Sequence, residues 1–539
     1  MSLDLSEART WSFAGGTWRA GDGGAMAPVD AHNANTELGM QACRFAFATD
    51  TSYRDFRATF QARHDTAHSD VGLIFRARNR RDFTLLHFPC CGQGYRAQHY
   101  WTALSRMDAS GFLRVDQLAM VNRVASSTRI WHDVEVEVRG GELCARIDGR
   151  GVFEHRGLPD AAGCVGLFVF GRASVRAVRI DGGRAPGAGW DDSVEQPANW
   201  FHPVEDAAQG VWQKPHALLR AGNGELVLTY NASRPGPAGT TSHLMTRSAD
   251  DGRTWSEPRV TGTVDGDPWT VRGTLHRFPD GRVRQLSMDR DGRFALADVS
   301  DDIRTIGAPR ALDLGPVPDG MTGLHMGPQV FANLDDGTVV MFLYGGHQSG
   351  PGHELIHTWG AVHCRAYTCR STDNGATWSP LVNIDHAVNG KGEPVPGSLD
   401  LTEVCGAETA DGTMVALIRP VYSPWMWETW SHDGGLTWTP CMRGPFPGYA
   451  TPNMLRTSSG VLLVAHRLPM MTVHASFDGG ASWQGSIIDS SIWVMGSMLE
   501  VRPDLVLYVY YDSFESRMRA QYLSVADGTL TPVRRDEID

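Results

Sequence analysis

The 539-residue sequence lacks the features of several protein classes. It has no long apolar run and a mean hydropathy of -0.27, which excludes a membrane-spanning helix. It has no block of lysine and arginine, and 49 basic against 61 acidic residues give a net charge of -12. Neither nucleic acid nor a membrane is therefore an expected partner. The first nine residues lack a basic stretch followed by an apolar one, so no signal peptide is expected.

A disulfide framework is also missing. The nine cysteines are an odd number, and spacings such as Cys90-Cys91 and Cys364-Cys369 do not form a regular pattern. This usage predicts buried thiols in a reducing compartment and favours the cytoplasm. By contrast, 60 glycines and 29 prolines indicate many turns.

One short pattern, S-x-D-x-G-x-[TS]-W, occurs four times, beginning at Ser248, Ser371, Ser431 and Ser476. The aspartate can accept hydrogen bonds from backbone N–H groups inside a tight turn. The glycine supplies a positive φ, and the tryptophan can fill an apolar slot between neighbouring sheets. Degenerate copies are expected at 299–302 and 523–528.

The copies start 123, 60 and 45 residues apart, and each lies in the order strand, glycine-rich turn, strand, loop, strand, box, strand. Four-stranded units repeated at such periods predict a β-propeller. We expect six blades, with the propeller and its catalytic site in residues 205–539 and a linker at 184–204. The fold class is therefore all-β.

Residues 1–183 contain no box and show short alternating strands, which predict a β-sandwich. Their order, with Val-Gly-Leu-Ile-Phe-Arg at 71–76, Trp131, Ile147-Asp-Gly149 and Val165-Gly-Leu167, resembles the concanavalin-like or laminin-G-like jelly roll. Such domains are often attached to carbohydrate enzymes. The sequence allows either a carbohydrate-binding module or a packing scaffold.

The boxes resemble those of the sialidase superfamily, whose propellers carry Asp-box or BNR repeats. In that superfamily the boxes lie on the face opposite the active site. The resemblance therefore implies a structural role for the box aspartates, Asp250, Asp373, Asp433 and Asp478. Function is expected at the other ends of the blade strands.

Glu403 precedes Arg419 by 16 positions, bridging strand, Asp-Gly turn and strand, and this matches the sialidase spacing. In the family the glutamate activates a tyrosine nucleophile and the arginine grips a substrate carboxylate. Several family residues are missing, however. Gln213 stands at the first arginine, 231–247 contains no carboxylate, no arginine opens blade five, and Trp493 stands near the expected tyrosine. A conventional sialidase mechanism is therefore not expected.

Two reaction classes fit what remains. Hydrolysis needs two carboxylates, and Glu403 as base or nucleophile with Asp289 or Asp512 as acid would supply them. A lyase needs a base beside a neutralised uronate carboxylate. The candidates for that chemistry are His216, His325, His347, Tyr511, Arg419 and Arg467.

The expected substrate clamps are cations, imidazoles and aromatic rings that suit a sugar pocket. They are Arg419, Lys214, Arg272, His325, His347, Trp425, Trp427, Arg467 and Trp493. His353-Glu-Leu-Ile-His357 matches a zinc motif, but that motif requires a helix, and the flanking Gly-Pro-Gly leaves room for one short turn. We therefore expect no metal and no cofactor.

These observations favour an exo-acting glycoside hydrolase that removes a terminal sugar from a glycan. Arg419, Arg467 and Lys214 favour an acidic sugar. Two alternatives stay open: a polysaccharide lyase acting on a uronate-containing glycan, and a non-catalytic glycan-binding protein.

Overall fold

The protein is described by a computed structural model. The described residues are 11–14, 17–20, 26–29, 43–65, 69–89, 102–107, 112–115, 129–170, 173–185, 189–194, 199–204, 212–233, 241–263, 274–289, 292–316, 321–348, 361–389, 391, 393–395, 400–420, 425–448, 452–467, 471–489, 496–512 and 517–538.

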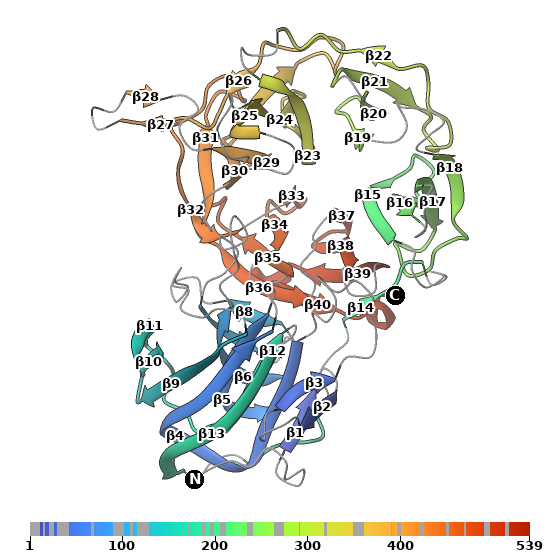
Figure 1. The fold of residues 1–539 in the computed structure, drawn as a ribbon. Coiled ribbons are helices and arrows are strands. Elements are labelled where there is room, and N and C mark those ends of the chain that lie inside the picture. Colours follow the sequence, from blue (N-terminus) through green and yellow to red (C-terminus); the bar gives the residue numbers. More distant parts are fainter. Residues whose placement is uncertain are drawn as a thin grey trace.

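The predicted all-β architecture is confirmed, and a ring of small antiparallel sheets forms most of the chain (Figure 1). Three blades follow one another with four strands each. The first contains β15 (Trp212–Arg220), β16 (Leu226–Ser233), β17 (Thr241–Ser248) and β18 (Arg259–Thr263). The second contains β19 (Thr274–Arg277), β20 (Val283–Met288), β21 (Phe294–Val299) and β22 (Arg310–Ala311). The third contains β23 (Met321–Asn333), β24 (Val339–Gln348), β25 (Ala361–Ser371) and β26 (Val382–Asn383).

Three further units complete the ring. The fourth contains β29 (Leu401–Glu408), β30 (Met414–Pro420), β31 (Trp425–Ser431) and β32 (Met442–Pro447), preceded by the small hairpin β27 (Ala387–Val388) and β28 (Pro394–Val395). The fifth contains β33 (Asn453–Arg456), β34 (Leu462–Arg467), β35 (Met471–Ser476) and β36 (Gln484–Asp489). The sixth contains β37 (Gly496–Arg502), β38 (Leu505–Asp512) and β39 (Arg517–Ser524), with β40 (Thr531–Val533) and β14 (Trp200–Phe201) both paired to β39. Two 3-10 turns, Ala526–Gly528 and Arg535–Glu537, end the described chain.

The fifth blade is not a separate sheet. Five of the predicted six blades are separate sheets, whereas the fifth unit continues into the N-terminal domain. Its outer strand β36 pairs with β8 (Leu113–Val115), with Gly485 opposite Val115 and Ile487 opposite Leu113. The side chain of Arg114 reinforces this junction by donating to the hydroxyl of Ser486 and the carbonyl of Leu530.

The N-terminal domain is built around β4 (Cys43–His64), a 22-residue strand shared by two antiparallel arrays. One array has the order β1–β4–β12–β5–β6–β7–β8, and the other β11–β10–β9–β4–β13–β3–β2. The bounds are β1 Trp11–Ala14, β2 Thr17–Ala20, β3 Met26–Val29, β5 Asp70–Asn79, β6 Asp82–Pro89, β7 Ala103–Met107, β9 Trp131–Arg139, β10 Glu142–Ile147, β11 Arg150–Arg156, β12 Gly163–Phe170 and β13 Ala173–Arg184. The jelly-roll relationship stays a prediction.

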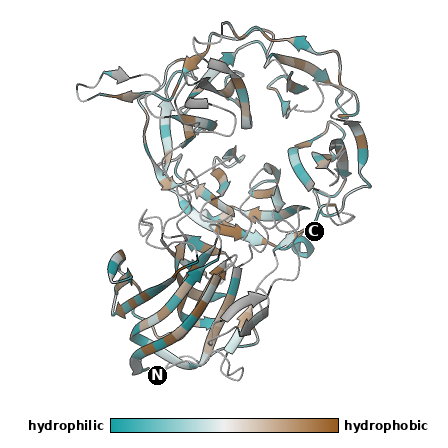
Figure 2. Cartoon of the chain, in the orientation of Figure 1, coloured by the Kyte–Doolittle hydropathy of each residue, from teal (hydrophilic) through white to brown (hydrophobic). Residues whose placement is uncertain are grey.

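The cores follow from the period-two alternation of the strands. In β9, Val134, Val136 and Val138 are buried while the residues between them are not. Figure 2 shows hydrophobic and hydrophilic bands alternating along strands of this domain. One cluster lies between the two arrays, and a second cluster on the other face of the β5–β6–β12 array includes Ile487 of the propeller. That array is therefore buried on both faces.

The four boxes form one recurring turn. In the first, the Asp250 carboxylate accepts the Thr254 N–H at 2.9 Å and the Thr254 hydroxyl at 2.6 Å, while the Ser248 hydroxyl accepts the Gly252 N–H at 2.8 Å. The same bonds recur around Asp373, Asp433 and Asp478. Each box glycine has a positive φ, and the box tryptophans pack into the clusters between blades. The degenerate copy at 299–302 keeps part of the pattern, because Ser300 donates to Asp302.

The described cysteines are unpaired thiols, and five of these six are buried. This agrees with the expectation of buried thiols. The described residues include no helix long enough and apolar enough to cross a membrane.

Candidate functional site

A β-bulge at the start of the inner strand of blade four places Glu403. Leu401 pairs with Pro420, but the next paired residue is Val404, opposite Ile418, so two residues of β29 face Arg419 alone. Such a bulge turns a side chain out of the regular ladder. Here it brings the Glu403 carboxylate within 2.9 Å of the Arg419 guanidinium, and only 9% and 10% of the two side chains are exposed. The spacing of 16 singled out both residues in the sequence, and their direct contact is an additional finding; their catalytic and binding roles stay predictions.

The bulge lies against the inner strand of blade three. A Cβ atom on Gly327 would lie 3.8 Å from both the Cα and the Cβ of Glu403. Two residues further along β23, the Gln329 amide donates to the Gly406 carbonyl and accepts from the Met454 N–H, which joins the inner strands of three blades. The backbone around Glu403 is therefore fixed from three sides.

Lys214 and Tyr344 lie close enough to Glu403 for its charge to affect their ionisation. Burial lowers the pKa of Lys214 to about 8, although the negative charge of Glu403 raises it. Burial and the same carboxylate hold the pKa of Tyr344 well above its usual value, with Arg419 acting in the opposite direction. These residues come from blades one, three and four, so the ring itself assembles the cluster. We call Lys214, Tyr344, Glu403 and Arg419 the Glu403 cluster.

His325 adjoins this cluster through Tyr344. The two residues are strand partners, and their ring centroids are 5.6 Å apart. His216 belongs to a different group in blade one, where its ring lies 6.0 Å from that of His243. Burial lowers the pKa of His216 to about 3, with the charges of Lys214 and His243 adding to the effect, so its imidazole is neutral at pH 7.

Gln213 occupies the position that the resemblance gives to an arginine. Its side chain is buried and accepts a hydrogen bond from the Met518 N–H of blade six. It therefore ties two blades together, while the neighbouring Lys214 brings a positive charge to Glu403.

The predicted acid Asp289 has a local partner. Its carboxylate accepts from the Arg293 N–H at 2.9 Å and from the Arg293 side chain at 2.7 Å, across the turn that joins β20 to β21. Arg293 is 72% exposed and Asp289 is buried. These contacts give Asp289 a role in closing the turn.

Two predicted aromatic clamps also differ in surroundings. Trp427 packs against the buried cluster between blades three and four, because every second residue of β31 faces that core. Trp427 is only partly buried, so its predicted stacking role stays a prediction. Trp425 is half-buried at the start of β31, and the Arg443 guanidinium lies 3.7 Å from its ring centroid. Tyr511 is buried in β38.

Other predicted residues cannot be placed in the same way. Arg272, Trp493 and the motif at 353–357 lie outside the described residues. The backbones of His347, Arg467 and Asp512 are described within β24, β34 and β38, but their side chains are not. Among described residues, no group of three or more His, Cys, Asp or Glu side chains is arranged to hold a metal ion.

The sequence did not point to Asp400 and Arg365, which lie beside the Glu403 cluster. The Asp400 carboxylate accepts the Cys364 N–H at 3.1 Å and contacts the Arg365 guanidinium at 3.4 Å. Neither residue belongs to a repeated motif. Only the pairing of blades three and four brings them together, so no local signal could have identified them.

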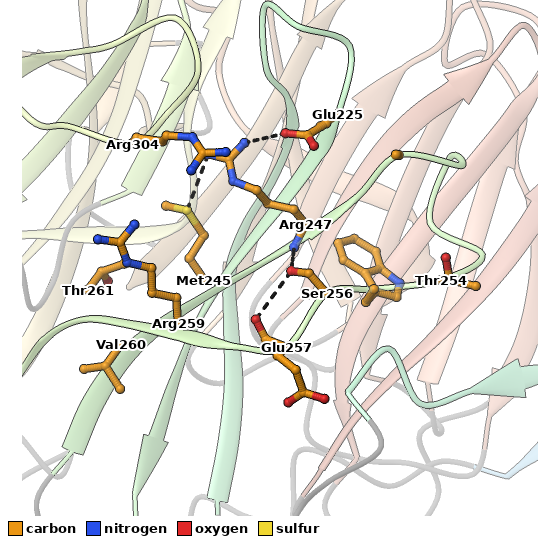
Figure 3. A pocket seen from close by; sticks show the side chains of 12 residues that line it. Glu225, Met245, Arg247, Thr254, Ser256, Glu257, Arg259, Val260, Thr261 and Arg304 are labelled. Atoms are coloured by element: carbon orange, nitrogen blue, oxygen red, sulfur yellow. Dashed lines mark hydrogen bonds and ion pairs between the residues drawn. The ribbon is translucent and has the colours of Figure 1, made fainter.

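Two clefts lie elsewhere, at the box end of blade one. One of about 710 Å³ is lined by Glu225, Arg247, Trp255, Arg259 and Arg304, among others (Figure 3). Arg247 is already engaged by Glu225 at 2.9 Å and by backbone carbonyls. The second, of about 750 Å³, shares Trp255 and Glu257 with the first. Because both contain box residues, they lie away from the Glu403 cluster.

No protein-family model and no curated protein matches the chain. A Hadza microbial sialidase, Hz136, is similar in structure with a TM-score of 0.44 and 17% identity, over 89% of this chain and 94% of that one. A leech intramolecular trans-sialidase has a TM-score of 0.43 and 10% identity over 97% and 98% of the two chains. An α-L-arabinanase from Penicillium chrysogenum has a TM-score of 0.43 and 14% identity over 63% and 98%. These likenesses carry no argument about activity, which depends on the site itself.

Proposed function

We propose that this protein hydrolyses the bond to a terminal sugar of a glycan, with a preference for an acidic sugar. The observation that supports this most directly is the buried contact between Glu403 and Arg419, at the bulged start of an inner blade strand. Buried charges are costly to a fold unless they are paired, and they concentrate at functional sites. The charge pattern of the cluster suits a substrate that is itself anionic.

In this proposal the cations hold the substrate and Glu403 acts on it. A guanidinium can bind a sugar carboxylate through two parallel hydrogen bonds, and Arg419 would do so by exchanging part of its contact with Glu403. Lys214 would add a second positive charge, since a pKa of about 8 keeps it mostly protonated at pH 7. Glu403 would then accept a proton from the attacking group or attack the anomeric carbon itself.

Tyr344 gives Glu403 a phenol as a proton partner. Because burial and the Glu403 charge raise its pKa, Tyr344 keeps its proton in the resting enzyme. It would therefore keep its proton and donate a hydrogen bond to the substrate or to the Glu403 carboxylate. His325, whose ring is tilted against the phenol ring at a centroid distance of 5.6 Å, would set the orientation of Tyr344.

The acid partner in this proposal is Asp512. Asp289, the other sequence candidate, is held by Arg293 across a turn. Asp512 ends β38 in blade six, where its backbone pairs with Arg517. Hydrolysis by two carboxylates requires a second carboxylate across the scissile bond from Glu403. We assign this role to Asp512 because β38 ends there, away from the box end of blade six.

The test is the substitution Glu403→Gln, assayed on oligosaccharides that end in neutral sugars, uronic acids or sialic acids. We expect the rate of product release to fall by about 100-fold or more, since a positioned base contributes about 10²–10⁴-fold. Glu408→Gln is the matched control, because Glu408 is buried on the same strand but accepts a hydrogen bond from Asp335 at the box end. A Glu403→Gln enzyme that keeps activity within about tenfold of wild type would refute the assignment.

A second candidate is a lyase acting on a uronate-containing glycan. It is favoured by the residues around Glu403, where a phenol, an imidazole and two cations are close and Asp289 is engaged elsewhere. Mass spectrometry separates the two reactions, because hydrolysis adds one water to the products. Elimination adds none and leaves an unsaturated uronate that absorbs ultraviolet light. Binding of the oligosaccharides without any product would favour the non-catalytic reading.

A further inference from the structure

The chain enters the strand that carries Glu403 through a strained aspartate. Asp400 has a φ of +52°, in the left-handed region that non-glycine residues seldom adopt. It immediately precedes β29, and the bulge that contains Glu403 begins two residues later. A residue held in this conformation persists only when surrounding contacts fix it, and such residues gather at functional sites.

Those contacts come from the neighbouring blade. The Asp400 carboxylate oxygen Oδ1 accepts the Cys364 N–H at 3.1 Å and the Arg365 guanidinium at 3.4 Å. Both partners lie on β25, the third strand of blade three. The Asp400 and Arg365 side chains are only 16% and 18% exposed, so water competes weakly with these bonds.

The same segment of β25 lies beside Tyr344. Cys364 pairs with Gly346 and Ala366 pairs with Tyr344 on β24. A buried carboxylate, Asp385, fixes this segment from its other side by accepting the Ala366 N–H at 3.2 Å. Asp400 therefore connects the strand next to Tyr344 with the strand that carries Glu403.

We propose that Asp400 is a positioning residue that sets the distance and orientation between Glu403 and Tyr344. This inference rests on the proposed function of the Glu403 cluster. Asp400 touches neither substrate nor reacting atoms in this role. It acts by fixing the start of β29 against β25, and a shift of about 1 Å at a reacting group can lower a rate by about 100-fold.

Two substitutions separate the contact from the backbone conformation. Asp400→Gly accepts the positive φ but loses both side-chain contacts. Asp400→Asn also tolerates this conformation and retains an oxygen for the Cys364 N–H. We expect Asp400→Gly to lower kcat by about 10- to 100-fold with KM within about threefold of wild type, and Asp400→Asn to restore kcat to within about threefold.

Asp504→Gly is the matched control. Asp504 also has a positive φ, of 60°, and its carboxylate also contacts a neighbouring blade, through the Ser459 hydroxyl. It lies in the β37–β38 turn, at the box end. We expect kcat for Asp504→Gly to stay within about twofold of wild type. An equal loss of kcat in both glycine variants, or a full rate in Asp400→Gly, would overturn the proposal.

Amide hydrogen exchange of the intact protein tests the role of Asp400 without an activity assay. Amides of residues 401–405 should exchange faster in Asp400→Gly than in wild type, and should not do so in Asp504→Gly. If wild type forms no product from any oligosaccharide, the proposed function fails and the exchange result alone decides the role of Asp400. Unchanged exchange at 401–405 would then refute it.

Discussion

The two ends of the propeller blades are built in opposite ways. At the box end, four turns repeat the same hydrogen bonds around Asp250, Asp373, Asp433 and Asp478. At the other end, the inner strands of blades one, three and four each contain a bulge, but the side chains differ from blade to blade. Blade four carries the buried Glu403–Arg419 pair, and a buried Asp489–Arg519 pair joins blades five and six. Repetition serves stability, because each box fixes its own turn against the neighbouring blade. Because the side chains at this end are not repeated, each blade can place different polar groups there.

The largest effect should come from breaking the buried pair. Arg419→Met leaves the Glu403 carboxylate buried without this partner, and we expect it to destabilise the protein by about 3–5 kcal/mol. The double substitution Glu403→Gln with Arg419→Met removes both charges and should recover a large part of that loss. Thermal unfolding followed by calorimetry measures both variants.

The control for this experiment is Arg304→Met. Arg304 contacts Asp302 at 3.2 Å, but its side chain is 52% exposed, so the expected loss is below about 1 kcal/mol. Equal losses for Arg304→Met and Arg419→Met would mean that the Glu403 pair gains nothing from its burial.

The next effect tests how tightly the box end is packed. Gly252 and Gly224 have similar φ values, of 95° and 90°. A Cβ on Gly252 would lie 2.4 Å from the Leu507 side chain, whereas a Cβ on Gly224 would meet nothing within 4 Å. We expect Gly224→Ala to cost about 1–2 kcal/mol from backbone strain. Gly252→Ala should cost about 1–3 kcal/mol more, from overpacking against blade six. Equal Tm shifts for the two variants would contradict the packing argument.

The two ends should also respond to acid in different pH ranges. His466 and His474, buried in blade five, share a hydrogen bond of 2.8 Å, and burial lowers the pKa of His466 to about 3. The folded state therefore resists protonation, so the stability from this pair is present above pH 6.5 and declines as the pH falls toward 3. At the box end, burial raises the pKa of Asp373, but hydrogen bonds from Thr377 and Ser371 outweigh it and lower the pKa to about 2. That contribution is present above pH 3.8 and declines toward pH 2.

Tm measured from pH 8 to pH 2 checks both ranges. His474→Gln should flatten the decline that begins near pH 6.5, and Asp373→Asn should flatten the part below about pH 4. If His474→Gln leaves the upper part of the curve unchanged, the His466–His474 pair does not control it.

The smallest effect is expected at Asp289. Asp289→Asn keeps an oxygen for the Arg293 N–H and weakens only the contact with an exposed guanidinium, so we expect a loss of about 0.5–1 kcal/mol. Product release should stay within about threefold of wild type. A fall of about 100-fold in the rate of product release would instead identify Asp289 as the acid, and blade two would then also contribute to the active site.

Local motifs explain why part of the site was predictable. Glu403 and Arg419 lie eight positions on either side of Asp411, so an antiparallel hairpin brings them near each other, and the bulge between Leu401 and Val404 then sets their contact. The packing of Trp427 was not predictable in the same way. Its position in the strand shows which face of the sheet it lies on, but not which neighbouring blade packs against that face. Its packing against the core depends on blade three. Asp400 and Arg365 gave no signal, since their contact joins segments that only the assembled blades bring together.

The sequence by itself determined the strands, the box turns and the ring of blades, because hydrogen bonds and side-chain alternation within a few residues specify each of them. It also singled out Glu403 and Arg419 as candidates, although their direct contact was found only in the structure. The tertiary structure alone decided that Lys214 and Tyr344 lie near enough to Glu403 to feel its charge, that Arg293 holds Asp289 across a turn, and that β36 continues into β8. The physical reason is the closure of the ring, which brings together strand ends far apart in the chain through contacts that no local pattern encodes.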